Sequence, residues 1–227
     1  MIHEGFEELL RKNAEHADQF RESFDHVQDA QRPDAVTVCC SDSRVLQDHM
    51  WGNDEPGRLF TCSNIGNRVI QRADSGETVS GDVLYPIEHT GTDLVVVVGH
   101  TGCGAVTATY DDLTGGLSEP PGITHCLELL GPHLERGVER LSGGVDRREA
   151  VNRLVEYNVD RQIEHLDGSR EVQDGVTLVG CVYDFQDVYG GQRGEIHVCN
   201  VNGETNVEVL REENPEVASR IRRLWEY

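Results

Sequence analysis

The most constraining feature of this sequence is a run of five aliphatic residues, Leu-Val-Val-Val-Val, at positions 94–98. A strand covered on both faces, as in a parallel sheet, is apolar throughout, whereas a half-exposed strand alternates apolar and polar residues. Short β-rich segments precede this run at residues 36–40 and 58–63, and two more follow at residues 176–183 and 195–201. We therefore expect a mainly parallel central sheet, with the last two strands forming an antiparallel edge.

Segments with helical periodicity separate these strands. Apolar residues recur at helical spacing in residues 124–141 and in residues 147–166, and Gly168 fits the end of the second helix. A further helix is expected after Gly104, and residues 76–89 are interpreted as a crossover helix. The alternation of strands and helices predicts an α/β fold with helices flanking the sheet.

Both ends of the chain are also expected to be helical. Apolar residues with roughly helical spacing mark the first segment, before Pro33: Phe6, Leu9, Leu10, Ala17, Phe20, Phe24 and Val27. Val217, Ile221, Leu224 and Trp225 suggest a closing helix. We interpret residues 1–227 as a single domain, in which residues 1–30 form a helical arm and residues 31–227 form the α/β core.

The charge of the chain excludes several classes of partner. It has 41 acidic and 20 basic residues, for a net charge of -21, and such a surface repels nucleic acid. No run of about 18 apolar residues predicts a membrane span, and the start lacks the apolar core of a secretory signal, so a cytoplasmic location is expected. The acidic excess resembles adaptation to molar salt, where charge repulsion is screened. An ordinary acidic protein is the alternative.

Two short motifs carry the chemistry. Cys40-Ser-Asp-Ser-Arg44 ends the first predicted strand, and His100-Thr-Gly-Cys103 follows the run at residues 94–98. Because the carboxyl ends of parallel strands face one crevice, we expect Cys40, His100 and Cys103 to converge. Two thiolates and one imidazole suit zinc, and three protein ligands leave a fourth position open, as in catalytic zinc sites.

The residues near the first motif refine this expectation. A guanidinium at Arg44 would lower the pKa of the Asp42 carboxyl and fix its orientation. Cys39 should point to the opposite face of its strand, away from the metal. The other cysteines lack ligand spacing and are interpreted as structural: Cys62, Cys126, Cys181 and Cys199. His49 and His89 are interpreted as solvated or packed, with proton relay as the alternative.

Cys-x-Asp-x-Arg followed by His-x-x-Cys resembles the β-carbonic anhydrases. The resemblance extends over residues 31–106 and includes the Glu-Pro-Gly turn at 55–57 and the Ser-Asn-Ile-Gly-Asn segment at 63–67. It implies that Cys40, His100 and Cys103 bind Zn²⁺ and that Asp42 and Arg44 form the dyad that orients a zinc-bound hydroxide. The implied activity is the reversible hydration of carbon dioxide to bicarbonate.

The same resemblance implies substrate-binding residues and a homodimer or dimer of dimers, in which the arm lies on the partner. Gln31 matches a glutamine that hydrogen-bonds substrate from the neighbouring subunit. Phe60 and Tyr85 match the lining of the carbon dioxide pocket, with core packing as the alternative. Thr37 and Ser63 replace a tryptophan and an arginine that build a regulatory bicarbonate pocket in another branch, so that regulation is not expected.

Other functions remain open at this level. Relatives with the same ligand set hydrolyse carbonyl sulfide or carbon disulfide. A non-catalytic zinc-stabilised binding protein would instead need a closed four-ligand site, for which Arg44 is not required. A redox role for Cys39 and Cys40 lacks the C-x-x-C spacing that tunes thiols. The glycine-rich segment at residues 187–194 is longer than the usual late hairpin of the family, and no role is assigned to it.

Overall fold

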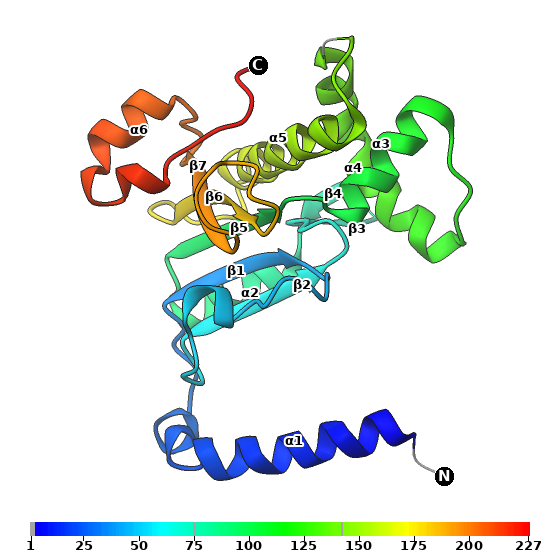
Figure 1. The fold of residues 1–227 in the computed structure, drawn as a ribbon. Coiled ribbons are helices and arrows are strands. Elements are labelled where there is room, and N and C mark those ends of the chain that lie inside the picture. The colour runs from blue at the N-terminus through cyan, green and yellow to red at the C-terminus, as the bar shows by residue number, and fades with distance from the viewer. Residues whose placement is uncertain (1–2, 75, 142) are drawn as a thin grey trace.

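A five-stranded sheet forms the centre of the computed structural model, which describes residues 3–74, 76–141 and 143–227 (Figure 1). The strands of this sheet are β1 (Ala35–Cys40), β2 (Leu59–Asn64), β5 (Leu94–His100), β6 (Thr177–Asp184) and β7 (Glu195–Val201). They lie in the order β2-β1-β5-β6-β7. All neighbours are parallel except β6 and β7, which pair antiparallel. The predicted parallel centre with an antiparallel edge is confirmed.

The two central strands are buried on both faces, as their apolar sequences predict. Every residue of β1 is buried, and so is every residue of β5 except Leu94. Alternate side chains of β1 enter different clusters: Cys40 joins the larger one, whereas Cys39 packs with Val98 and Cys181 in the smaller one. Cys39 therefore faces away from Cys40, as predicted.

Four helices follow the order expected from the sequence: α2 (Gly81–Thr90), α3 (Gly104–Gly115), α4 (Pro121–Arg140) and α5 (Arg147–Asp167). α5 packs against β5, β6 and β7, and α4 packs against α3 and α5. The side chain of Asp146 caps α5 by accepting hydrogen bonds from the backbone N–H groups of Arg148 and Glu149. The helix expected over residues 147–166 is confirmed.

The segment expected to be a crossover helix from residue 76 divides into two elements. Strands β3 (Ile70–Ala73) and β4 (Gly76–Val79) pair as an antiparallel hairpin, and the helix begins only at Gly81. The side chain of Ser80 accepts a hydrogen bond from the backbone N–H of Asp82, which fixes this start. The expectation is therefore wrong for residues 76–79.

The expected closing helix is also wrong. The chain instead forms α6 (Val207–Glu213) and a 3-10 helix, η3 (Pro215–Arg220), and is irregular after Ile221. The buried carboxylate of Glu156 accepts hydrogen bonds from the backbone N–H groups of Leu224 and Trp225. These bonds give the two N–H groups partners on α5, so they do not need the partners that a helix would supply. The apolar residues of this segment are therefore spaced for packing on α5 and not for a helix.

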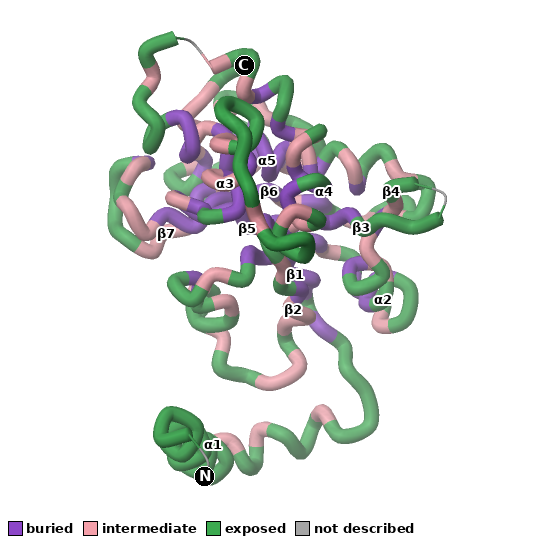
Figure 2. The backbone as a smooth tube through the Cα atoms, turned by 90° about the vertical axis from the view of Figure 1, so that its right-hand side faces the viewer, coloured by how far each residue is buried: buried purple, intermediate pink, exposed green. Residues whose placement is uncertain are grey.

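The N-terminal arm is helical, as predicted, but its own chain does not cover it. Helix α1 (Glu4–Phe20) and the 3-10 helix η1 (Glu22–Val27) have no buried residue, and all of their residues are described. Both views show α1 standing away from the sheet (Figures 1 and 2). A further 3-10 turn, η2, spans His49–Trp51. Within the described residues, no helix has the length and apolarity needed to cross a bilayer.

Candidate metal centre

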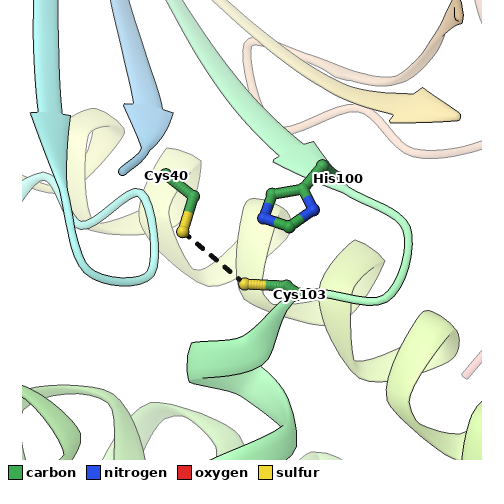
Figure 3. Close-up of side chains that lie close together, drawn as sticks. All are labelled: Cys40, His100 and Cys103. Carbon is green, nitrogen blue, oxygen red and sulfur yellow. Dashed lines mark hydrogen bonds between the residues drawn. The ribbon is translucent and has the colours of Figure 1, made fainter. Parts of the chain in front are cut away.

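The ends of two neighbouring parallel strands and the start of one helix meet at a single point (Figure 3). Cys40 is the last residue of β1, and His100 is the last residue of β5. Cys103 is the N-cap residue of α3, three positions after His100. All three residues are buried, so the convergence predicted from the sequence is present.

The spacing of these side chains fits a tetrahedral metal. One ligand atom from each residue lies within 4.8 Å of the other two, and within the described part of the chain no other such group of three is found. The Sγ atoms of Cys40 and Cys103 are 3.8 Å apart. Two sulfurs that bind zinc at about 2.3 Å with a tetrahedral angle are separated by about 3.8 Å. The thiol pair is therefore already spaced as zinc ligands.

His100 presents its free nitrogen to the same point. Its Nδ1 lies 3.1 Å from the carbonyl oxygen of Thr101, which fits an Nδ1–H donor and leaves the lone pair on Nε2. This Nε2 is buried and has no hydrogen-bond partner among the described residues. Because a buried polar atom without a partner is costly, its position favours a role as metal ligand. The donor set thus fits zinc.

The two cysteines form a hydrogen-bonded pair. Cys103 donates a hydrogen bond to Cys40 Sγ, which lowers the pKa of Cys40 to about 5 and, together with burial, raises the pKa of Cys103 well above its ordinary value. The backbone N–H groups of Ala105 and Val106, in the first turn of α3, act in the opposite direction on Cys103. The helix start thus lowers the pKa of Cys103 in part, against the larger upward effects of Cys40 and burial.

Beside the cluster, Arg44 and Asp42 form a bidentate ion pair, called the Asp42–Arg44 fork below. Arg44 Nε donates to Asp42 Oδ1 over 2.8 Å and Arg44 Nη2 donates to Oδ2 over 2.7 Å. These bonds hold the pKa of the Asp42 carboxyl well below its usual range. Asp42 Oδ2 lies 3.7 Å from His100 Nε2, so the ionised carboxylate adjoins the group of Cys40, His100 and Cys103.

The turn between His100 and Cys103 is held by residues that the sequence analysis missed. Gly102 has a φ of 64°, a conformation that favours glycine, and its backbone N–H donates to Asn152 Oδ1 over 2.8 Å. Thr101 Oγ1 donates to Asp184 Oδ1 over 3.2 Å. Asp184 ends β6, so the strand-end argument used for Cys40 also applies to it. No comparable signal marks Asn152, which lies within α5.

The predicted substrate-binding residues lie elsewhere in this chain. Phe60 is near the start of β2, four residues before Asn64, which pairs with Cys40. At about 3.3 Å per residue, Phe60 is therefore roughly 13 Å further along the strand. The ring of Tyr85 is 6.2 Å from that of Phe60 and is half exposed. Gln31 is exposed in the segment that leads to β1.

A mostly apolar pocket of about 330 Å³ adjoins the cluster instead. Its lining comes from the end of β1, from the segment after β2 and from helices α3 and α4: Cys40, Ser41, Asp42, Ile65, Gly104, Ala105, Ala108, Gly122, Ile123, Cys126 and Leu127. The lining thus includes the Asp42 carboxylate and Cys40 of the cluster, and most of it is apolar. Such a pocket suits a small uncharged molecule.

Of the two histidines considered for proton relay, neither contacts the cluster. His49 is exposed, and the His89 ring lies 4.8 Å from the ring of Tyr85 on α2.

The glycine-rich segment at residues 187–194 connects β6 to β7. Within it, Tyr189 is buried and its hydroxyl donates to Glu156 over 2.9 Å. This segment therefore anchors the sheet edge to α5.

Comparisons with known sequences identify the family that this chain resembles. A sequence model of the carbonic anhydrase family matches residues 35–196. A carbonic anhydrase of Pseudomonas aeruginosa is 31% identical over 170 residues, which are 72% of this chain and 74% of that protein. A carbonic anhydrase of Helicobacter pylori is 28% identical over 120 residues, so the chain spans about half of that relative, 53% of its length.

Solved structures share the fold. The β-carbonic anhydrase CafA of Aspergillus fumigatus aligns with a TM-score of 0.71 at 27% identity, over 97% of this chain and 100% of that one. A tetrameric β-carbonic anhydrase of Sordaria macrospora also has a TM-score of 0.71, at 23% identity, over 86% of this chain and 97% of that one.

Proposed function

This chain belongs to the carbonic anhydrase family, and from that premise we propose that it catalyses the reversible hydration of carbon dioxide to bicarbonate and a proton. One observation carries the proposal. The buried cluster of Cys40, His100 and Cys103 lies beside an Asp42 carboxylate that Arg44 keeps ionised. A metal held by these three protein ligands would retain an open position, and the adjacent carboxylate gives that position a hydrogen-bond acceptor.

Zn²⁺ held by Cys40, His100 and Cys103 would supply the Lewis acidity that makes water a nucleophile near neutral pH. Asp42 accepts a hydrogen bond from the attacking O–H and so aims the oxygen lone pair at the carbon of carbon dioxide. Arg44 fixes both carboxylate oxygens of Asp42 and keeps the carboxylate from turning onto the metal. The product anion and the proton then leave the site.

The Asp42–Arg44 fork argues against the rival reading as a structural zinc protein. In a closed four-ligand site, Asp42 or another group would stay on the metal permanently. Here both Asp42 oxygens are engaged by Arg44 at 2.8 and 2.7 Å. A carboxylate held in this way can hydrogen-bond a reacting molecule at the metal. A purely structural zinc site has no need of such a carboxylate.

We further propose that the working protein is a homodimer or a dimer of dimers. Helix α1 exposes an apolar face that includes Phe6, Leu9 and Leu10, each about half exposed or more. An uncovered apolar face of this kind favours a partner surface. In such a dimer, Gln31 would hydrogen-bond substrate in the pocket of the other protomer. Phe60 and Tyr85 would line a carbon dioxide pocket, and the position of Phe60 roughly 13 Å along β2 from the residue paired with Cys40 is consistent with a pocket completed by the partner.

Three further features of the proposal concern the whole chain. Residues 1–227 act as one domain, with residues 31–227 as the catalytic core and residues 1–30 as the dimerisation arm. The protein acts in the cytoplasm on carbon dioxide and bicarbonate and binds neither nucleic acid nor membrane. Its net charge of -21 supports adaptation to high salt.

Stopped-flow measurement of carbon dioxide hydration tests the proposal. The protein is stripped with a chelator, reloaded with Zn²⁺ and assayed in molar potassium chloride at about pH 8.5. We expect fast turnover only in the zinc-loaded form, at one zinc per chain. Zinc binding to a folded protein without turnover would contradict the proposal. Assays with carbonyl sulfide and carbon disulfide then show whether the site acts on a sulfur-containing substrate instead.

A further inference from the structure

One aromatic ring adjoins both the metal cluster and the catalytic dyad. Phe185 directly follows β6, and its ring centroid lies 5.7 Å from that of His100, with an angle of 26° between the planes. The guanidinium carbon of Arg44 lies 4.8 Å from the centroid of the same ring. Phe185 thus contacts one predicted metal ligand and one member of the dyad, although it lies 82 positions or more beyond both motifs in the sequence.

The backbone around Phe185 is firmly anchored. Asp184, the preceding residue, accepts hydrogen bonds from the backbone N–H groups of Gln186, Val188 and Tyr189, over 3.0, 2.7 and 2.8 Å. The same carboxylate accepts the hydroxyl of Thr101, as described above. A ring attached to such a turn has a fixed position relative to the His100–Cys103 turn.

Neither neighbour of the ring is fully fixed without it. The hydrogen bond at His100 Nδ1 restrains one edge of the imidazole, but the tilt of its plane depends on what packs against its face. The Arg44 side chain is half exposed, and besides its bonds to Asp42 it donates only to the Gly102 carbonyl, over 3.2 Å, among the described residues. A planar guanidinium stacks well on an aromatic face, which restrains it against solvent.

We infer that Phe185 is a positioning residue that orients the His100 imidazole and, through Arg44, the Asp42 carboxylate. The expected effect of Phe185 on turnover rests on the proposed function. The expected effect on metal binding is independent of it. Without the ring, Arg44 loses the surface on which it stacks and is held only by its bonds to Asp42 and the Gly102 carbonyl. The Asp42 carboxylate is then oriented less firmly, and the imidazole loses one of its packing surfaces. Residues that orient metal ligands in this way typically change metal affinity or activity by about 10- to 100-fold.

The test compares Phe185→Leu with Phe185→Tyr, and uses Tyr183→Leu as the matched control. Leucine fills much of the space but has no π face, whereas tyrosine keeps the ring. Tyr183 lies 6.0 Å from Phe185, in the same apolar cluster, and has no stacking contact with His100 or Arg44 among the described residues. Tyr183 is also the sheet neighbour of His100, so loss of its ring measures the effect of disturbed packing beside the site without loss of the ring that stacks on His100.

Three readouts are needed. Zinc affinity is measured by competition with a chromogenic chelator, and the absorption bands of the Co²⁺-substituted protein report the ligand geometry. Steady-state hydration kinetics then separate kcat from KM. For Phe185→Leu we expect zinc affinity about 10-fold weaker, altered Co²⁺ bands, and kcat lowered about 10-fold or more at a nearly unchanged KM. Phe185→Tyr should keep zinc affinity, Co²⁺ bands and kcat close to those of wild type.

The inference is overturned if Phe185→Leu matches wild type, or if it changes only as much as Tyr183→Leu. Should Phe185→Leu fail to fold, Phe185→Met replaces it, because the flexible methionine side chain adapts to irregular gaps. If the wild-type protein does not hydrate carbon dioxide, the proposed function fails, and the zinc affinities and Co²⁺ spectra still decide the role of Phe185.

Discussion

At the scale of single residues, two carboxylates are shifted in opposite directions by their surroundings. Arg44 hydrogen bonds hold the pKa of Asp42 well below its usual range, so Asp42 stays ionised at any working pH. Burial raises the pKa of Glu156 to about 7, although Arg223 and several hydrogen bonds act against this rise. One guanidinium faces two buried carboxylates there, Glu156 and Asp160, so their charges are not fully compensated.

The shift at Glu156 predicts a pH-dependent stability. A folded-state pKa of about 7, against an ordinary value of 4.5, means that the folded chain binds this proton more tightly than the unfolded chain. The resulting stabilisation is complete below about pH 4.5 and is lost as the pH rises through about 7. The loss is on the order of 3 kcal/mol.

Urea unfolding of wild type and Glu156→Gln at pH 5 and pH 8 measures this loss, with protein and salt concentrations held fixed. Glutamine cannot titrate, so all other pH effects are shared. We expect wild type to lose about 2–3 kcal/mol more than the variant between the two pH values. Equal losses in both proteins would contradict the assignment.

At the scale of elements, the strand ends were predictable from sequence and the closing segment was not. The apolar run of β5 and the motifs after β1 and β5 specify a parallel sheet and a convergence of Cys40 with His100, because these follow from local pattern and sheet geometry. The path after Ile221 depends on Glu156 and Asp160, about 60 residues away on α5. Apolar spacing alone does not distinguish a packed extended tail from a helix.

The short hairpin of β3 and β4 was missed for a related reason. Each strand has four residues, and β4 begins at Gly76, whose φ is 117°. Such short strands carry too little alternation to reveal their period. The roles of Asn152 and Phe185 also escaped the sequence analysis, since both act through contacts between distant segments.

The docking of the C-terminal segment on α5 predicts a large effect of one arginine. Arg223 Nη2 lies 2.7 Å from Asp160 and 3.3 Å from Glu156, and all three side chains are nearly inaccessible to solvent. Replacing Arg223 with methionine leaves two buried carboxylates without their cation, which should cost about 3–5 kcal/mol of unfolding free energy.

Arg220→Met is the matched control for this measurement. Arg220 pairs with Glu195 at 3.3 Å, but its side chain is 46% exposed, so its loss should cost about 1 kcal/mol or less. Urea unfolding of the two variants gives the comparison. A similar small cost for both would show that the buried network does not stabilise the C-terminal segment.

At the scale of the whole molecule, the uncovered face of α1 predicts the oligomeric state. Replacing Phe6 and Leu10 with serine should weaken the dimer, because both side chains are about half exposed in the single chain and would be buried at an interface. Multi-angle light scattering over a concentration series measures the mass. Replacing the exposed Glu7 and Lys12 with serine is the control. Equal masses for both double variants and wild type would exclude the arm from the interface.

The net charge predicts a strong dependence of stability on salt. With a charge of -21, the folded chain repels itself at low ionic strength, and this repulsion is screened in molar potassium chloride. We expect the thermal midpoint to rise by about 10 °C between 0.1 and 2 M salt, which corresponds to roughly 3 kcal/mol. At pH 4.7, the calculated isoelectric point, the rise should be much smaller. An equal rise at both pH values would show that charge screening is not the cause.

The most direct test of the catalytic account is the rate of carbon dioxide hydration by zinc-loaded Asp42→Asn beside that of wild type. Asparagine retains the shape of Asp42 but lacks its charge, so it pairs weakly with Arg44 and is a poorer hydrogen-bond acceptor for the attacking O–H. The account predicts one zinc per chain in both proteins and a rate at least about 100-fold lower in the variant. Asp174→Asn, a change at an exposed acidic residue, should leave the rate unchanged. An Asp42→Asn protein that binds zinc and turns over at the wild-type rate would contradict the account.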